Sequence, residues 1–296
     1  MKYIIMFVLS INIFALEVLL PKGPPSLPIA RVALNMKDIN LKYYTDPVVE
    51  VVPNIIRNQD YLYVIPVNLG AKLYSKNQDL KLLAVLSQGM LSIVSSKDYT
   101  DIKNLDNEII HIGGQGSSPD VVSQYIFSKN NIKPQIQYRS SEEVAKLMIS
   151  KRGTSAVLPE PLASLVLSKN QEFKRSFILK DLWGDGDEVN SIPQVGIFAS
   201  KALLEKNVDL IKEFEREYKR SLQWIEEDII NAGNFALEVF NLNLDNKVIV
   251  EAIKNMNLVF IKGKDAQKEV EGYLNKLKNV DKGIIDLIPG DDFYQK

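Results

Sequence analysis

Few residues in this chain of 296 residues could perform covalent or metal chemistry. Cysteine is absent, which excludes thiol nucleophiles, disulfide bonds and thiolate metal sites. His111 is the only histidine, so a Ser-His-Asp triad could form in one way only and a multi-histidine metal site cannot form. His111 also lies inside an apolar run, Ile109–Ile112, where we expect a packed, hydrogen-bonded histidine. We therefore expect no metal and no cofactor.

The strongest local pattern is the glycine-rich segment Gly113–Pro119, which directly follows that apolar run. Glycines allow the backbone to approach a ligand closely, and the start of a following helix attracts a polar or anionic group. Gln115, Gly116 and Ser117 lie in this turn, and we expect Ser118 to cap the helix. No Lys-Ser or Lys-Thr pair follows the glycines, so nucleotide binding is weakly supported. An ordinary strand-to-helix turn is the alternative.

Two other expected strand-to-helix turns leave open the same choice between a ligand contact and a plain turn. Ser26 and Leu27 follow a pair of prolines at one of them. At the other, we expect Asn68 to cap a helix that begins at Leu69. Glu160 stands between two prolines after an apolar strand, so its carboxylate is a candidate ligand contact, although most glutamates are simply solvated.

Strands alternate with helices along the chain, which predicts an α/β protein with largely parallel sheets. We expect Leu80–Leu86 and Met90–Val94 to form one long strand kinked near Gln88-Gly89, and Val48–Val52 to be extended. The unit of strand, Gly/Pro/Ser loop and helix occurs at residues 16–33 and again at 109–127. Open α/β sheets bind ligands at such positions, so two facing units predict a cleft.

Residues 1–15 predict a short secretory signal peptide, in which Ala15 is a small residue suited to the last position before a cleavage site. Lys2 precedes an apolar run that is too short to span a bilayer, where about 20 residues are needed. A buried first strand is the alternative. No cysteine follows the run, so we expect an exported protein without a lipid anchor. The 36 Lys and Arg residues nearly balance the 37 Asp and Glu residues, which argues against nucleic-acid binding.

Six short motifs follow one another in an order that is familiar from one family. They are Pro21–Pro28, Pro66–Tyr74, Gly114–Asp120, Val157–Ser164, Ile192–Gly196 and Pro289–Tyr294. Together they resemble the substrate-binding proteins of ABC importers, in the branch related to nitrate, sulfonate, taurine and thiamine-precursor binders. The resemblance spans essentially the whole chain after the signal peptide.

The resemblance implies a two-lobed periplasmic binding protein type 2 fold with two hinge crossover strands. It places lobe 1 at residues 16–87 and 196–296 and lobe 2 at 88–195. The ligand-binding residues that it implies are Ser26, Leu27, Asn68, Leu69, Gln88, Gly89, Gln115, Gly116, Ser117, Ser118, Glu160 and Gln194.

The function that the resemblance implies is capture of a small polar or anionic ligand without chemistry. The partners are then an ABC permease with its ATPase, and we expect a periplasmic monomer that binds no nucleic acid. The alternative is a biosynthetic enzyme on the same fold, of the type that makes a pyrimidine or menaquinone precursor, with His111 as its one candidate base.

Overall fold

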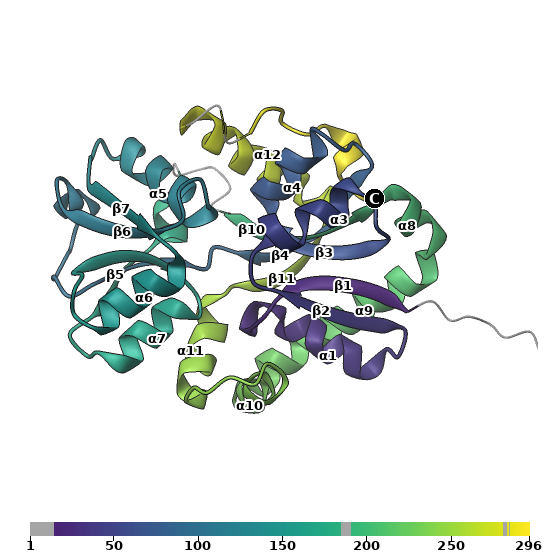
Figure 1. Cartoon of the computed structure of the whole chain (residues 1–296), viewed down its shortest axis with the longest axis horizontal. Helices are drawn as coiled ribbons and strands as arrows, with labels where there is room; N and C mark the ends of the chain where they lie inside the picture. Colours follow the sequence, from purple (N-terminus) through teal and green to yellow (C-terminus); the bar gives the residue numbers. More distant parts are fainter. Residues whose placement is uncertain (1–14, 185–190, 281–282, 284) are drawn as a thin grey trace, which may run out of the picture.

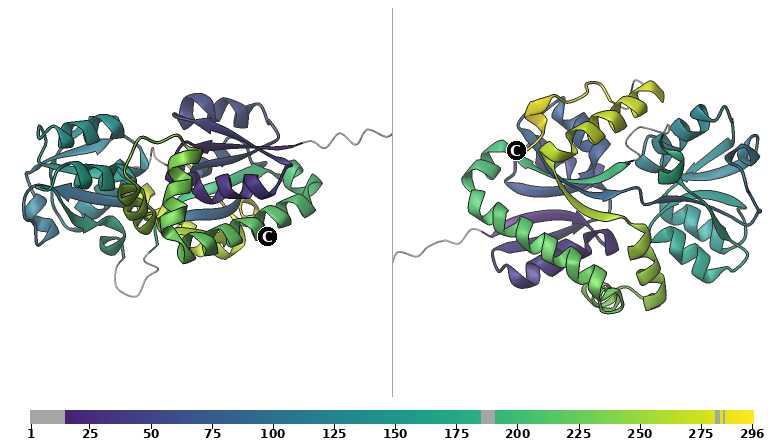
Figure 2. Two further views of the ribbon diagram at one scale, coloured as in Figure 1. Left: turned by 90° about the horizontal axis from the view of Figure 1, so that it is seen from below. Right: turned by 180° about the vertical axis from the view of Figure 1, so that it is seen from behind.

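The computed structural model describes residues 15–184, 191–280, 283 and 285–296. The expected signal peptide, apart from Ala15, lies outside the described residues. The strands form two separate sheets, and each sheet with its helices makes one lobe (Figure 1). Figure 2 shows the same division from below and from behind. The two-lobed α/β fold expected from the sequence is therefore confirmed.

The first lobe contains a six-stranded sheet in the order β11-β4-β10-β3-β1-β2. Its strands are β1 Leu16–Pro21, β2 Ile39–Tyr44, β3 Tyr61–Pro66, β4 Leu80–Gln88, β10 Pro193–Ser200 and β11 Leu258–Lys262. One face packs against α4 Val67–Tyr74 and α12 Gly263–Val280. The other face packs against α1 Leu27–Asn35, α8 Lys201–Lys206 and α9 Val208–Glu227. This sheet is therefore covered by helices on both faces.

The second lobe contains a five-stranded sheet in the order β7-β6-β8-β5-β9. Its strands are β5 Leu91–Ser95, β6 Ile109–Gly113, β7 Gln135–Arg139, β8 Ser155–Pro159 and β9 Lys174–Ile178. α5 Ser118–Lys129 covers one face, whereas α6 Ser141–Ile149 and α7 Leu162–Lys169 cover the other. The expected capping box starts α6, because the Ser140 hydroxyl accepts from the Glu143 N–H and the Glu143 carboxylate accepts from the Ser140 N–H.

The sheets are mixed, so the expectation of largely parallel sheets was wrong. β10 is antiparallel to β3 and β4, and β5 is antiparallel to β8 and β9. These are the strands next to the two crossings between the lobes, and the chain reverses its direction there. β1 with β2 and β3, and β6 with β7 and β8, are the parallel pairs. All three expected ligand-facing turns follow strands of these parallel groups, namely β1, β3 and β6.

Two further expectations about local structure were also wrong. β4 and β5 are separate strands in different sheets, because Gly89 between them has a φ of 77°, which a regular strand does not allow. The expected extended segment Val48–Val52 is helical and contributes to α2 Pro47–Glu50 and α3 Val52–Ile56. The Asp46 carboxylate accepts hydrogen bonds from two N–H groups at the start of α2, and this cap outweighs the β-branched side chains.

The two lobes are joined by two crossings. Gln88–Met90 leads from β4 to β5, and the return path leads from the short 3₁₀ helix η3 (Leu179–Leu182) to β10. Two more helices, α10 Ile229–Val239 and α11 Asn246–Asn255, lie between α9 and β11. The structure defines two sheets, and we propose that the lobes have the bounds expected from the sequence.

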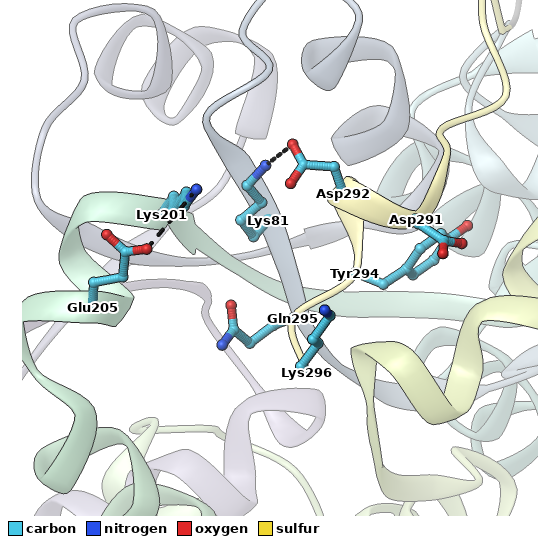
Figure 3. A pocket seen from close by; sticks show the side chains of 8 residues that line it. All are labelled: Lys81, Lys201, Glu205, Asp291, Asp292, Tyr294, Gln295 and Lys296. Atoms are coloured by element: carbon cyan, nitrogen blue, oxygen red, sulfur yellow. Dashed lines mark hydrogen bonds and ion pairs between the residues drawn. The ribbon is translucent and has the colours of Figure 1, made fainter.

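The C-terminal segment Pro289–Lys296 lies beside the first residues of β4 in the first lobe (Figure 3). Tyr294 forms a parallel bridge with Leu82 of β4. Next to it, the Lys81 ammonium lies 2.7 Å from the Asp292 carboxylate, and the Lys81 side chain is only 5% exposed. A charge so deeply placed is costly unless it is paired. The segment therefore neutralises a lysine that the sheet buries.

We predict that Asp292→Asn lowers the melting temperature, because it leaves the buried Lys81 ammonium without its carboxylate. Asp291→Asn is the matched control, since Asp291 pairs with Lys264 and both side chains are exposed. Differential scanning calorimetry of the two variants measures the difference. Equal melting temperatures for the two variants contradict the assigned role of Asp292.

Candidate functional site

The candidate site is a cavity of about 470 Å³ between the two lobes. The first lobe contributes the junction of β3 and α4, and the second contributes the loop between β6 and α5. Each junction places the unpaired N–H groups of a first helical turn beside the cavity. Six residues singled out from the sequence line it: Asn68, Leu69, Gln115, Gly116, Ser117 and Ser118. The structure thus brings together two turns that are distant in sequence.

Asn68 is not the helix cap that the sequence predicted. α4 begins at Val67, with Pro66 in the capping position, so Asn68 already lies in the first helical turn. A residue with helical backbone angles does not cap its own helix. Asn68 is 8% exposed, and its side-chain oxygen forms no hydrogen bond among the described residues. The amide is therefore buried at the cavity wall and available to a ligand.

Ser118 was likewise expected to cap a helix and does not. α5 begins at Ser118 itself, with Ser117 in the capping position, and the Ser117 hydroxyl donates to the Gly113 carbonyl instead. Ser118 is 8% exposed, and its hydroxyl also forms no hydrogen bond within the described part of the chain. Buried polar atoms without partners are uncommon in native structures. Asn68 and Ser118 place one such atom on each side of the cavity.

Asp120 holds the glycine-rich loop in its conformation through hydrogen bonds. It is buried, and its carboxylate accepts hydrogen bonds of 2.8 Å from the Gly116 N–H, the Tyr138 hydroxyl and the Gln124 amide. Gly114 and Gly116 have φ angles of 65° and 74°, which glycine adopts without strain. Asp120 is therefore saturated by the protein, and it fixes the loop that carries Gln115 to Ser118.

The remaining lining residues were not predicted as site residues from the sequence. They are Pro47, Val48, Pro66, Lys72 and Gly283. Among the described lining residues, Lys72 alone has a charged side chain, and its ammonium donates to the Gly283 carbonyl at 3.3 Å. Helical spacing could have indicated Lys72, since it follows Asn68 by one helical turn on α4. The Asp46-Pro47 pair could have indicated α2, which brings Val48 to the cavity.

Five predicted site residues lie near the hinge or within the first lobe rather than along the cavity. The Gln88 amide donates to the Ser191 hydroxyl and the Glu269 carboxylate, at 2.8 and 2.6 Å. The Gln194 side-chain oxygen accepts from the Met90 N–H at 2.9 Å. The other three are Gly89 at the first crossing and Ser26 and Leu27 at the start of α1, both buried. These five are not among the lining residues.

Glu160 is also outside the cavity lining. It is buried, with one carboxylate oxygen 2.7 Å from an Arg175 nitrogen and the other accepting from the Ser164 N–H at 3.2 Å. Arg175 further donates to the Ser92 hydroxyl at 2.6 Å, which ties β8, β9 and β5 together. Burial raises the pKa of the Glu160 carboxyl, while Arg175 and Ser164 act in the opposite direction. The carboxylate is thus engaged within the second lobe.

His111 is packed, as expected, but away from the cavity. Its ring lies against Gly153, on the face of β6 that α6 covers, and its Nδ1 has no hydrogen bond among the described residues. Burial, followed by the charge of Arg139, lowers the pKa of His111.

The described residues contain no group of three or more histidine, aspartate or glutamate side chains that could hold a metal ion. Within the same part of the chain, no helix has both the length and the apolar character needed to cross a bilayer.

No protein-family model and no curated protein matches the sequence. Solved structures do match the fold. An ABC transporter protein from Parabacteroides distasonis is 20% identical, with a TM-score of 0.78 over 96% of this chain and 99% of that one. The periplasmic aliphatic sulphonate binding protein SsuA from Escherichia coli is 12% identical, with a TM-score of 0.73 over 96% and 92%.

A third match is a Candida albicans protein described as having the generic periplasmic binding protein fold. It is 18% identical, with a TM-score of 0.61 over 94% of this chain and 92% of that one. All three likenesses extend over both lobes. The chain therefore has the two-lobed periplasmic binding protein fold.

Proposed function

We propose that this chain is the extracytoplasmic solute-binding protein of an ABC importer and that its interlobe cavity binds a small polar or anionic molecule. The composition of the cavity lining carries the proposal. Helix starts from both lobes meet there, Asn68 and Ser118 present buried oxygens without hydrogen-bond partners in the described structure, and Lys72 supplies a positive charge. The described lining residues include no carboxylate, so nothing in that wall repels an anion.

Binding at such a seam selects the closed arrangement of the lobes. A ligand that contacts both α4 and α5 makes all of its contacts only when the lobes are together. It therefore shifts an open–closed equilibrium by the difference between its affinities for the two forms. The closed protein then delivers its ligand to a membrane permease, and a separate ATPase supplies the energy for transport.

The fold likeness supports this role. Two of the similar structures are described as an ABC transporter protein and a periplasmic aliphatic sulphonate binding protein. We propose the same setting here: a monomer in the periplasm, exported by its signal peptide. Small sulfonates are consequently reasonable first probes for the cavity.

The lining also favours binding over catalysis. A biosynthetic enzyme on this fold needs a group in the cavity that accepts or donates a proton. The described lining residues include no histidine, carboxylate or tyrosine, and His111 lies behind β6 against Gly153. The observed side chains are amides, hydroxyls and one ammonium, which donate and accept hydrogen bonds and so suit reversible capture.

We predict that at least one of nitrate, bicarbonate, methanesulfonate and butanesulfonate raises the melting temperature of the purified protein. A ligand at a hundredfold excess over its Kd stabilises the folded state by about 2.7 kcal/mol. Native mass spectrometry of the freshly purified protein shows whether a molecule is already bound. Failure of all four anions, together with mass spectra of the bare chain, contradicts the anionic class.

Lys72→Gln is expected to weaken the binding of the most stabilising anion by roughly tenfold, because it removes one charge-assisted hydrogen bond. Lys76→Gln is the matched control, since Lys76 is exposed and is not among the lining residues. Isothermal titration calorimetry at two salt concentrations compares the variants. The wild type and Lys76→Gln should lose affinity with salt, and Lys72→Gln should lose less.

Glu160→Gln tests the carboxylate of the second lobe. Because burial raises the folded-state pKa of Glu160 above its usual value of 4.5, the stability it contributes is present below that value and is lost as pH rises through the folded pKa. The wild type should therefore lose stability relative to Glu160→Gln as pH increases above 4.5, measured as the difference in melting temperature. An opposite trend contradicts the burial argument.

The same variant tests the ligand contact predicted for Glu160 from the sequence. Affinity for the most stabilising anion is measured at pH 7 for wild type and Glu160→Gln. Unchanged affinity contradicts a direct contact between Glu160 and the ligand.

A further inference from the structure

The lobes touch each other away from the hinge as well as through it. α5 of the second lobe packs against α12 of the first on one side, and α7 packs against α11 on the other (Figure 1). On the α5 side the contact is apolar, since residues of α5 and α12 belong to one hydrophobic cluster that runs through both lobes. The lobes are therefore held together by side chains, in addition to the backbone crossings.

Trp183 lies at the centre of this contact. It directly follows η3 on the return path between the lobes, and it is only 1% exposed. Its ring centroid lies 4.5 Å from that of Tyr125 on α5 and 5.6 Å from that of Tyr273 on α12. Aromatic pairs at these separations attract each other beyond the area that they bury. One indole thus bridges a ring from each lobe.

Lys276 adds a charge to the same cluster. Its ammonium lies 5.5 Å from the centroid of the Tyr125 ring and 5.6 Å from that of Trp183. Lys276 is on α12 and Tyr125 is on α5, so this cation–π contact also crosses between the lobes. We refer to Tyr125, Trp183, Tyr273 and Lys276 as the interlobe clasp.

The interlobe clasp is connected to the cavity through α5. Ser118 at the start of this helix lines the cavity, and Tyr125 follows about two turns later on the same rigid element. Movement of α5 therefore affects the cavity wall and the interlobe clasp together.

We propose that the interlobe clasp holds the lobes closed over the cavity. Separation of α5 from α12 breaks the contacts of Trp183 and exposes its indole. Closure and the environment of Trp183 therefore change together.

The closing role is tested without a ligand. The chain has two tryptophans, Trp183 and Trp224. Trp224 is on α9, and the Arg31 guanidinium lies 3.8 Å from the centroid of its ring. Trp224→Phe thus leaves Trp183 as the only reporter. In this background we expect Lys276→Met to raise the open fraction about threefold. Acrylamide quenching of Trp183 and the radius of gyration from small-angle scattering both increase as a result.

Lys268→Met is the matched control, because Lys268 is an exposed lysine of the same helix. It should leave quenching and scattering unchanged. If Lys276→Met fails to fold by circular dichroism, Tyr125→Leu replaces it, since leucine keeps apolar bulk and removes the ring. A folded variant with the quenching and radius of the control overturns the closing role.

Discussion

The arrangement of the two lobes depends on how the backbone is held at the first crossing. The Met90 N–H donates to the Gln194 side chain at 2.9 Å, and the Met90 carbonyl accepts from the Glu160 N–H at 3.0 Å. The Gly89 carbonyl accepts from the Asn257 amide at 2.8 Å. Residues from both lobes therefore form hydrogen bonds with two consecutive peptide groups at this crossing. Because this region is tightly bonded, movement between the lobes is a rotation about it, and distant elements move furthest.

The cavity and the interlobe clasp are the consequences of that geometry. Both lie where α5 approaches the first lobe, α4 at the cavity and α12 at the clasp. A small rotation about the crossing therefore changes both together. Ligand contacts at Ser118 and aromatic contacts at Trp183 stabilise the same arrangement, and each lowers the free energy needed to form the other. This is the physical basis of coupling between capture and closure.

Local sequence predicted the turns well and the tertiary neighbours poorly. The glycines and prolines correctly indicated that Asn68 and Ser118 stand at helix starts, because turn chemistry is local. The helix register was off by one or two residues, since either serine of a Ser-Ser-Pro start satisfies the capping pattern. Val48 was misplaced because its β-branched side chain outweighed the Asp46 cap in our prediction. The position of Glu160 outside the cavity could not be predicted, because its partner Arg175 is distant in sequence and comes next to it only in the folded sheet.

The distribution of carboxylates explains how a nearly neutral chain could select a charged ligand. Asp120 and Glu160 are buried in the second lobe, one behind the glycine-rich loop and one beside the hinge. Asp120 accepts three hydrogen bonds from its own lobe and Glu160 is paired with Arg175, which reduces the field that the two carboxylates project into the cavity. The wall that faces the ligand is left with amide, hydroxyl and ammonium groups. Selectivity for an acceptor-rich ligand then follows from which charges the protein has already neutralised, and the overall charge contributes little to it.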